Sequence, residues 1–340
     1  MNADRQMAPG RLMAAEIAEV PMVFARAALA EHGVALAPLG LAGKRALYTI
    51  ARGSSDAAAN ILAYEIMRET ALPVTSLPPS VFSLGQGVKM AAAAALVISQ
   101  SGASDDLVKS ARGIRARGGV VLAITNVPGS AVEAAADATL PIGAGPERAV
   151  PATKSVIGAV AAGMALLAAL VPGYGARAQV AAQCFAGLEG TAHPRAGELV
   201  SALLRARHVY VIGRDTGYGA AQEVALKLKE CCALHAEAYS ASEVLHGPLQ
   251  LVTNPLLIVM LDTGAALVQP SLDAAEARFR AAGGTVFRLR PAEVGAHGLT
   301  PAAAAALLLY LVYPVVLTVA VALGLDPDHP ATLSKVTQTT

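Results

Sequence analysis

Residues 94–106, AALVISQSGASDD, contain the pattern that decides the fold of this 340-residue chain. Ala94–Ser99 is a short apolar run without polar alternation, which is typical of a strand buried on both faces of a sheet. A serine-rich turn follows directly, and Asp105 and Asp106 then begin a stretch with helical spacing. A strand, a tight turn and a helix in this order indicate a parallel α/β architecture.

The same pattern recurs along the chain, with short apolar runs that predict strands and longer stretches between them that predict helices. The predicted strands are Ala46–Ala51, Ala94–Ser99, Gly119–Thr125, Ala138–Pro141, His208–Ile212, Leu256–Leu261 and Thr285–Arg290. The predicted helices include Met13–Ala30, Ala57–Glu69, Ser104–Arg117 and one from Glu223 to about Cys232. We therefore expect an α/β fold of doubly wound parallel sheets, in a flavodoxin-like arrangement of three αβα layers.

The chain also repeats itself weakly, with its second half matching its first at a nearly constant offset. Residues 48–53 (YTIARG) align with residues 210–215 (YVIGRD), and residues 97–102 (VISQSG) align with residues 259–264 (VMLDTG). Matching order at one offset indicates two copies of one domain. The expected parts are an N-terminal helical segment (1–30), a first domain (31–185), a second domain (195–325) and a C-terminal tail (326–340).

The composition favours a protein of the reducing interior of the cell. A net charge of +1 gives no electrostatic footprint for nucleic acid or for an anionic membrane surface. The cysteines, Cys184, Cys231 and Cys232, have neither a metal-site spacing nor that of a disulfide framework. The first residues contain no apolar core of signal-peptide length, so we expect a cytoplasmic protein.

One apolar run is long enough to pass for a membrane span, and a membrane-associated transporter component would be one interpretation of it. This run, Ala302–Leu323, contains no charged residue. It is also alanine-rich at its start, contains Pro314 and has no basic cluster beside it. A second apolar run, Val156–Leu170, is too short to span a bilayer. We therefore expect both runs to be helices buried inside the protein, with no membrane partner.

Two serine-rich turns follow predicted strands of the first copy, at the end of the sheet where ligands bind in parallel folds. Residues 99–106 (SQSGASDD) and 52–56 (RGSSD) offer hydroxyls, backbone N–H groups and helix N-termini to a phosphate. Serine and aspartate are also common as helix N-caps, so each turn taken alone could be purely structural. The corresponding turn of the second copy, residues 261–266 (LDTGAA), lacks the serines. We infer that the first copy holds a phosphate and that the second supplies acid and base.

Residues 223–248 (EVALKLKECCALHAEAYSASEVLHGP) gather the chemistry-bearing side chains of the second copy. Lys227 and Glu230 are three residues apart and share one face of the predicted helix. His246 follows in a turn that Gly and Pro terminate. A carboxylate, an amine and an imidazole suit proton transfer on a sugar carbon, although a solvated helix face would carry the same charges. The other side chains are expected to be structural: Cys231 and Cys232 as core residues behind Glu230, and His235 as a hydrogen-bonding partner.

These motifs together resemble the sugar isomerase (SIS) family, and within it the isomerase half of glucosamine-6-phosphate synthase and the stand-alone deaminases related to it. The match runs in order from residue 13 to the C-terminus. The segments that carry it are 13–17 (MAAEI), 51–55 (ARGSS), 99–102 (SQSG), 144–154 (AGPERAVPATK), 225–230 (ALKLKE), 235–239 (HAEAY), 246–248 (HGP) and 328–335 (DHPATLSK).

The resemblance implies roles for individual residues. Glu230 matches the base that moves a proton between C1 and C2, Lys227 matches the lysine beside it, and Lys335 matches a tail lysine that contacts the sugar carbonyl. His246 matches a histidine that helps to open the sugar ring and that, in the family, reaches in from the neighbouring subunit, which implies a homodimer. Contacts with the phosphate and the rest of the substrate are implied at Ser54, Ser55, Ser99, Gln100, Ser101, Ser104, Val150 and Ser334.

Some positions depart from the family or have a plainer interpretation. Ala103 stands where the synthases have a glutamate, and Asn2 stands where their glutaminase domain has its cysteine nucleophile. We therefore expect that ammonia is not drawn from glutamine by that route. Glu147 and Lys154 would serve equally as a helix-capping pair. The resemblance implies no metal and no cofactor.

We therefore predict a deaminase/isomerase that converts glucosamine 6-phosphate to fructose 6-phosphate and ammonia, through ring opening and proton transfer between C2 and C1. Within the same family, a fructosamine-6-phosphate deglycase or an isomerase of galactosamine or tagatose phosphates stays open. An alternative of another class is a phosphosugar-sensing domain without turnover. The intact acid and base residues, and the lack of a basic DNA-binding appendage, count against that alternative.

Overall fold

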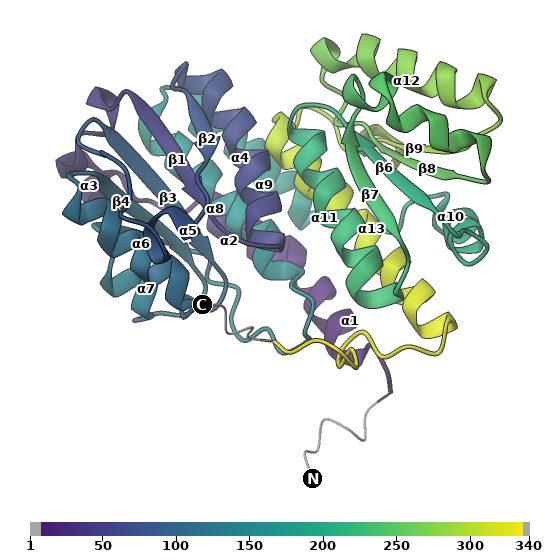
Figure 1. Ribbon diagram of the computed structural model, residues 1–340, viewed down its shortest axis with the longest axis horizontal. Helices are drawn as coiled ribbons and strands as arrows, with labels where there is room; N and C mark the ends of the chain where they lie inside the picture. The colour runs from purple at the N-terminus through teal and green to yellow at the C-terminus, as the bar shows by residue number, and fades with distance from the viewer. Residues whose placement is uncertain (1–7, 336–340) are drawn as a thin grey trace.

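The computed structural model of the protein describes residues 8–335. Residues 1–7, which include Asn2, and residues 336–340 of the predicted tail lie outside the described residues. The chain forms two parallel sheets that lie side by side, with helices packed on their faces (Figure 1). The first sheet has the strand order β2-β1-β3-β4-β5 and the second has the order β7-β6-β8-β9. These orders confirm the doubly wound α/β fold that the sequence predicts.

All seven predicted strands are confirmed, with ends within one residue of the prediction. Two further strands, β2 and β7, lie at the edge of each sheet and were not predicted. The strands of the first sheet are β1 (Ala46–Ile50), β2 (Val74–Ser76), β3 (Ala93–Ser99), β4 (Val120–Thr125) and β5 (Ala138–Pro141). Those of the second are β6 (Val209–Gly213), β7 (Ala236–Ser240), β8 (Leu257–Leu261) and β9 (Thr285–Leu289).

The helices alternate with these strands. Those before and within the first domain are α1 (Arg11–Ala18), α2 (Val20–Ala28), α3 (Gly33–Leu36), α4 (Ser54–Thr70), α5 (Ser80–Ser83), α6 (Asp105–Ala116), α7 (Ala131–Ala134) and α8 (Lys154–Leu170). Those that follow are α9 (Tyr174–Ala186), α10 (Ala196–Leu203), α11 (Thr216–Cys232), α12 (Gln269–Ala281) and α13 (Pro301–Ala322).

The prediction of one leading helix over Met13–Ala30 is wrong, because two helices, α1 and α2, meet at Glu19. Pro21 is the second residue of α2. A proline there has no N–H for the carbonyl four residues earlier, and its ring would clash with that carbonyl in a continuous helix. The chain therefore starts a new helix, for which a proline in the first turn is well suited.

The structure confirms the internal duplication in detail. Helices α4 and α11 have the same length, and the offset between their first residues, like that between their last, equals the offset of the sequence repeat. The residues that flank them also correspond: Gly53 and Asp215 precede the helices with φ near 54° and 59°, and Ala71 and Ala233 follow with φ of 55° and 51°. The two helices pack against each other, where Asn60 donates a hydrogen bond to Gln222, its own counterpart in the repeat (Nδ2–Oε1 2.8 Å).

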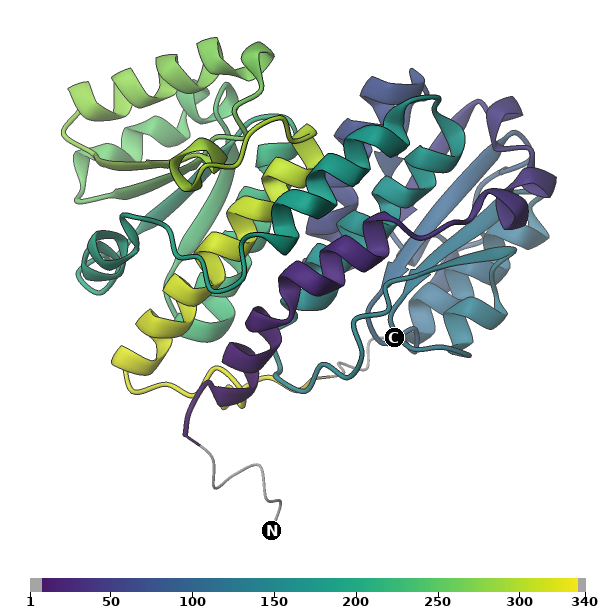
Figure 2. The same cartoon turned by 180° about the vertical axis from the view of Figure 1, so that it is seen from behind.

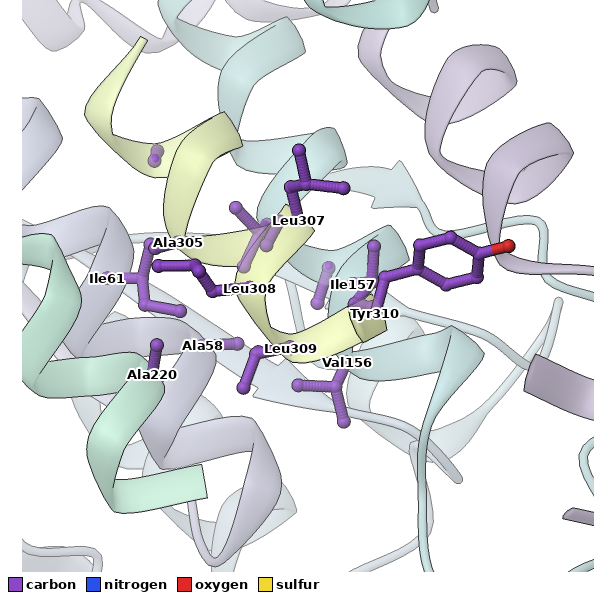
Figure 3. Close-up of a cluster of buried hydrophobic side chains, with 14 of the residues drawn as sticks. Ala58, Ile61, Val156, Ile157, Ala220, Ala305, Leu307, Leu308, Leu309 and Tyr310 are labelled. Carbon is purple, nitrogen blue, oxygen red and sulfur yellow. The ribbon is translucent and has the colours of Figure 1, made fainter. Parts of the chain in front are cut away.

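Helix α13 explains the long apolar run near the C-terminus. By length and composition this helix could cross a membrane, but 78% of its most apolar window is buried inside the protein. It runs through the middle of the molecule between the two domains (Figure 2). Figure 3 shows its side chains, among them Leu307 and Leu308, in a cluster with Ile61 of α4, Ile157 of α8 and Ala220 of α11. The burial of α13 accounts for the apolar composition of this run. The burial of α8 likewise accounts for that of the second run, Val156–Leu170.

Candidate active site

A cavity of about 240 Å³ lies between the carboxyl end of the first sheet, the last turns of α11 and the C-terminal tail. We call it the serine pocket. Its lining includes every predicted site residue except His246, namely Ser54, Ser55, Ser99, Gln100, Ser101, Ser104, Val150, Lys227, Glu230, Ser334 and Lys335. Segments from the first domain, the second domain and the tail thus meet in one place, although their roles stay a prediction.

The floor of the serine pocket is the turn after β3. Ser99 is buried, and its Oγ accepts a hydrogen bond from the N–H of Gly102 (3.0 Å), while Ser101 Oγ accepts one from Ala103 (3.3 Å). Gly102 has a φ of +60°, and a Cβ there would lie 2.2 Å from the Oγ of Ser130, so only glycine fits this turn. Ser104 then precedes α6 with an extended backbone. The turn therefore presents hydroxyls and the start of a helix to the pocket.

On the opposite side, Lys227 lies at the centre of a buried ionic cluster. Its Nζ donates to Ser54 Oγ (2.8 Å) and contacts Glu230 Oε2 (2.5 Å) and Glu223 Oε1 (3.4 Å). Burial alone would lower the pKa of Lys227, but the two carboxylates outweigh it and raise that pKa above its ordinary value. The amine is therefore a permanent cation within the pocket wall.

The two carboxylates differ in their access to the pocket. Glu223 is fully buried, accepts a hydrogen bond from Tyr313 (Oη–Oε1 3.1 Å), and its Oε2 has no hydrogen-bond partner among the described residues. Burial raises the pKa of Glu223 to about 7, against the opposing charge of Lys227. Glu230, in contrast, has a side chain that is 27% exposed and lines the cavity. Of the two, Glu230 is the carboxylate that a ligand in the pocket can reach.

The tail reaches the pocket through an anchor on α1. Asp328 is buried, and its two carboxylate oxygens accept hydrogen bonds from the N–H groups of Leu12 and Met13, each at 2.8 Å. Its backbone oxygen accepts from the N–H of Val150 (3.1 Å). A carboxylate at the first turn of a helix is also favoured by the helix dipole. This anchor fixes the segment that continues to Ser334 and Lys335 at the pocket.

The loop that contains Val150 is held by two buried glutamates. Glu147 accepts from the N–H groups of Thr153 and Ser155, both at 3.0 Å, and its other oxygen lies 3.4 Å from Lys335 Nζ. Glu147 therefore caps α8, whereas Lys154 does not form a pair with it and instead contacts Glu19 (2.7 Å).

On the other side of the loop, Glu16 accepts hydrogen bonds from the N–H groups of Arg148 and Ala149. Burial chiefly raises the pKa of Glu16 to about 7.

His246 does not line the serine pocket of its own chain. It ends a short 3-10 helix (Glu243–His246) and is exposed. His235 is also exposed, and its ring lies edge-on to that of His208, 6.1 Å between centroids. Cys231 and Cys232 are buried in the core behind Glu230, as predicted. In the part of the chain that the structure describes, no group of three or more His, Cys, Asp or Glu side chains could hold a metal ion.

The structure also adds residues to the pocket that the sequence analysis gave no role. The most polar of them is Arg52, which the motif ARGSS contained but which carried no predicted function. The sequence feature that could have indicated a role for Arg52 is its position directly after a predicted strand of the first sheet. The others are apolar: Ile98, Leu107, Ala152 and Leu333.

Comparison with known proteins gives a consistent result. A family model described as SIS domain matches residues 40–169 and 202–286, which is more than half of the chain. A curated relative, the isomerizing glutamine–fructose-6-phosphate aminotransferase of Symbiobacterium thermophilum, is 36% identical over 267 residues, which cover 71% of this chain and 43% of that protein. The chain spans about half the length of the curated relatives that it matches.

Solved structures show the same fold over nearly the whole chain. A candidate phosphosugar isomerase from Silicibacter pomeroyi is 31% identical with a TM-score of 0.79, covering 93% of this chain and 99% of that one. The glucosamine-6-phosphate deaminase of Thermotoga maritima has a TM-score of 0.75 at 18% identity, covering 96% of this chain and 100% of that one. At that identity the second likeness concerns the fold alone.

Proposed function

The chain belongs to the SIS domain family, and from this membership and the geometry of the serine pocket we propose that it is an enzyme that acts on phosphorylated amino sugars. The favoured reaction is the conversion of glucosamine 6-phosphate and water to fructose 6-phosphate and ammonia. The observation that carries the proposal is that Glu230, paired with Lys227, faces the same small cavity as the serine-rich turn after β3. The name of the curated relative, which contains fructose 6-phosphate and an amino transfer, supports this choice of substrate.

The reaction follows from the groups at the pocket. The serine-rich turn and the start of α6 bind the 6-phosphate, which places the other end of the open-chain sugar near α11. Glu230 removes the proton from C2 and returns it to C1, while a second proton passes from the amino nitrogen to O1, so that the 2-amino aldehyde becomes a ketimine at C2 with a hydroxyl on C1. Water then adds to C2, ammonia leaves, and fructose 6-phosphate remains. Lys227 and Lys335 stabilise the negative charge that develops on the sugar oxygens during proton transfer.

Two features of the cluster support Glu230 as the base. The Lys227 cation holds its carboxylate in one orientation (2.5 Å), and Glu223 behind them keeps that cation in place. Lys227 also donates to Ser54, so the acid–base cluster and the first domain are joined at the pocket. A base held in this way needs no large rearrangement when a substrate binds.

We also propose that the active unit is a homodimer in which His246 of one chain completes the pocket of the other. His246 is exposed and lies outside the pocket of its own chain, which supports a role at a partner's pocket. Mixing Glu230→Gln and His246→Ala proteins should restore part of the turnover through hybrid dimers. No restoration, with subunit exchange demonstrated, would contradict the shared site.

The experiment that tests the proposed function measures ammonia and fructose 6-phosphate formation from glucosamine 6-phosphate. Glu230→Gln should lower kcat by about 10²–10⁴-fold while substrate binding persists. The matched control is Glu198→Gln, since Glu198 is an exposed carboxylate that also forms an ion pair, with Arg195. Near-normal turnover by Glu230→Gln would refute the assigned base.

The same assay separates the alternatives. Ammonia release only from fructosamine 6-phosphate would identify a deglycase, and reaction only with galactosamine or tagatose phosphates would identify an isomerase of the other epimer. Phosphosugar binding without any product on prolonged incubation would identify a sensing domain.

A further inference from the structure

The proposed reaction assigns no role to one cation of the serine pocket, Arg52. Arg52 lies between β1 and α4, in the turn that leads to Ser54 and Ser55, and it lines the same cavity as Ser99, Ser101 and Ser104. Its side chain is 46% exposed, and its Nε forms an ion pair with the Asp106 carboxylate (2.5 Å). Asp106 is itself buried in the first turn of α6. Arg52 is therefore held beside the turn that follows β3.

The other two cations of the pocket are paired with glutamates. Lys227 contacts Glu230 and Glu223, and Lys335 lies 3.4 Å from Glu147. Arg52, in contrast, is paired with Asp106 in the helix that follows the serine-rich turn. A phosphate there would also meet the negative charge of Asp106 unless a cation lay beside it.

The planar shape of the guanidinium matters for this position. A guanidinium has five N–H donors in a fixed fork, and Arg52 uses Nε for Asp106. Among the described residues, no hydrogen bond of its two Nη groups is found. The counterpart of Arg52 in the second copy, Arg214, differs in this respect, because its Nη1 donates to Ser240 (2.9 Å) and Ser242 (2.7 Å). The Nη donors of Arg52 are thus available to a ligand, whereas Arg214 uses one of its own for the protein.

We propose that Arg52 binds the phosphate of the ligand, with Asp106 as the positioning residue that orients its guanidinium toward the serine-rich turn. This inference rests on the proposed function and deepens it, because it assigns a charged phosphate contact that selects phosphorylated over free sugars. Paired N–H donors of arginine fit two phosphate oxygens at once, which a lysine does not reproduce. Arg52 touches the substrate but takes no part in the proton transfer.

The test measures equilibrium binding, so that it does not depend on turnover. The probes are glucosamine 6-phosphate and inorganic phosphate, titrated into the wild type and into Arg52→Gln, Arg52→Lys, Asp106→Asn and the double variant Arg52→Gln/Asp106→Asn. The control is Arg115→Gln, because Arg115 is an arginine of α6 with nearly the same exposure (47%) that is paired with Asp137. Circular dichroism melts check that each variant is folded.

We expect Arg52→Gln to weaken both probes by about 10- to 100-fold, and Arg52→Lys to recover part of the loss. The Kd of Asp106→Asn should be at most about 10-fold higher than that of the wild type. The Kd of the double variant should equal that of Arg52→Gln. Arg115→Gln should match the wild type.

Three results would overturn the inference. If the double variant binds like the wild type, Arg52 serves only to neutralise Asp106. If Arg52→Gln binds like the wild type, Arg52 has no contact with the phosphate. If Asp106→Asn does not fold, the comparison of Arg52→Gln with Arg115→Gln still tests whether Arg52 binds the phosphate. If the wild type binds neither probe, both this inference and the proposed function fail, whereas binding without turnover removes the proposed function alone.

Discussion

The anchor of the C-terminal tail gives a prediction whose size follows from the structure. In Asp328→Asn, one amide oxygen replaces two carboxylate oxygens that accept from Leu12 and Met13 at 2.8 Å. One buried N–H therefore loses its acceptor, and the interaction of a negative charge with the start of α1 disappears. A hydrogen bond to a charged group contributes about 1.5–3 kcal/mol, and the charge at a helix start contributes up to about 1 kcal/mol. We expect the tail to be held more weakly by about 2 kcal/mol.

Limited proteolysis measures this quantity directly. Trypsin cleaves after Lys335 when the tail leaves its position, and the loss of residues 336–340 is visible by mass spectrometry. When local opening is rapid and rare, the cleavage rate follows the population of the open form, so about 2 kcal/mol corresponds to about 30-fold faster cleavage. If Lys335 contacts the substrate, glucosamine 6-phosphate should slow this cleavage in the wild type.

The matched control is Asp137→Asn. Asp137 accepts a backbone hydrogen bond from Val121, also at 2.8 Å, but lies on the first sheet away from the tail. Its variant should leave cleavage after Lys335 unchanged. Cleavage of Asp328→Asn at the wild-type rate would refute the anchor, and equal acceleration in Asp137→Asn would show that the effect is a general loss of stability.

Three further predictions concern stability. Gly219→Ala should lower the free energy of unfolding by about 1–3 kcal/mol in urea titrations, because its Cβ would lie 2.7 Å from the backbone N of Ile61 in α4. The control is Gly197→Ala, which is also in a helix but has no atom within 4 Å of the added Cβ, and it should raise the free energy of unfolding by up to about 1 kcal/mol. Equal effects of the two substitutions would contradict the close packing of α4 and α11. Glu65→Ala should cost about 2–5 kcal/mol, because it leaves the buried Tyr174 hydroxyl (2.9 Å) and Ala302 N–H (3.2 Å) without an acceptor; a loss below about 1 kcal/mol would exclude this role. The pKa of Glu16, raised by burial from 4.5 to about 7, means that its contribution to stability is complete below pH 4.5 and is lost as the pH rises through 7. Glu16→Gln should therefore flatten the fall of unfolding free energy between about pH 5 and 8, and an unchanged slope would show that Glu16 does not titrate there.

The strands were predictable wherever a sheet buries both faces of the chain. Such a strand is a continuous apolar run, as in β3, where every residue is buried. The two missed strands, β2 and β7, lie at sheet edges and have partly exposed residues, among them Thr75 and Glu237. Both strands are short of apolar residues (VTS and AEAYS), so neither contains the continuous apolar run that indicates a buried strand.

The site was predictable where its parts are local in sequence. The serine-rich turns and the Lys227–Glu230 pair each follow from a few neighbouring residues. That Arg52 and Lys335 line one cavity depends on the packing of α1, the loop around Val150 and the tail, which no short pattern encodes. Val150 and Ser334 were assigned through the family resemblance alone.

The two copies of the repeat differ at the position of the serine pocket. At the offset that relates α4 to α11, Lys227 corresponds to Glu65 and Glu230 to Arg68, and both copies have an ion pair between residues three apart on equivalent helices. The order of charges is reversed, however. Glu65 is fully buried and accepts hydrogen bonds from Tyr174 and from the first turn of α13.

The start of α13 therefore lies against the position that corresponds to the acid–base cluster. Thr216, the counterpart of Ser54, donates to the backbone oxygen of Pro301 (3.0 Å), whereas Ser54 accepts from Lys227 at the pocket. Glu65 and Thr216 are thus used for contacts with the first turn of α13, whereas their counterparts, Lys227 and Ser54, line the serine pocket. The two positions therefore differ in which part of α13 they meet: its first turn contacts Glu65 and Thr216, whereas Tyr313, farther along the same helix, contacts Glu223 behind the pocket.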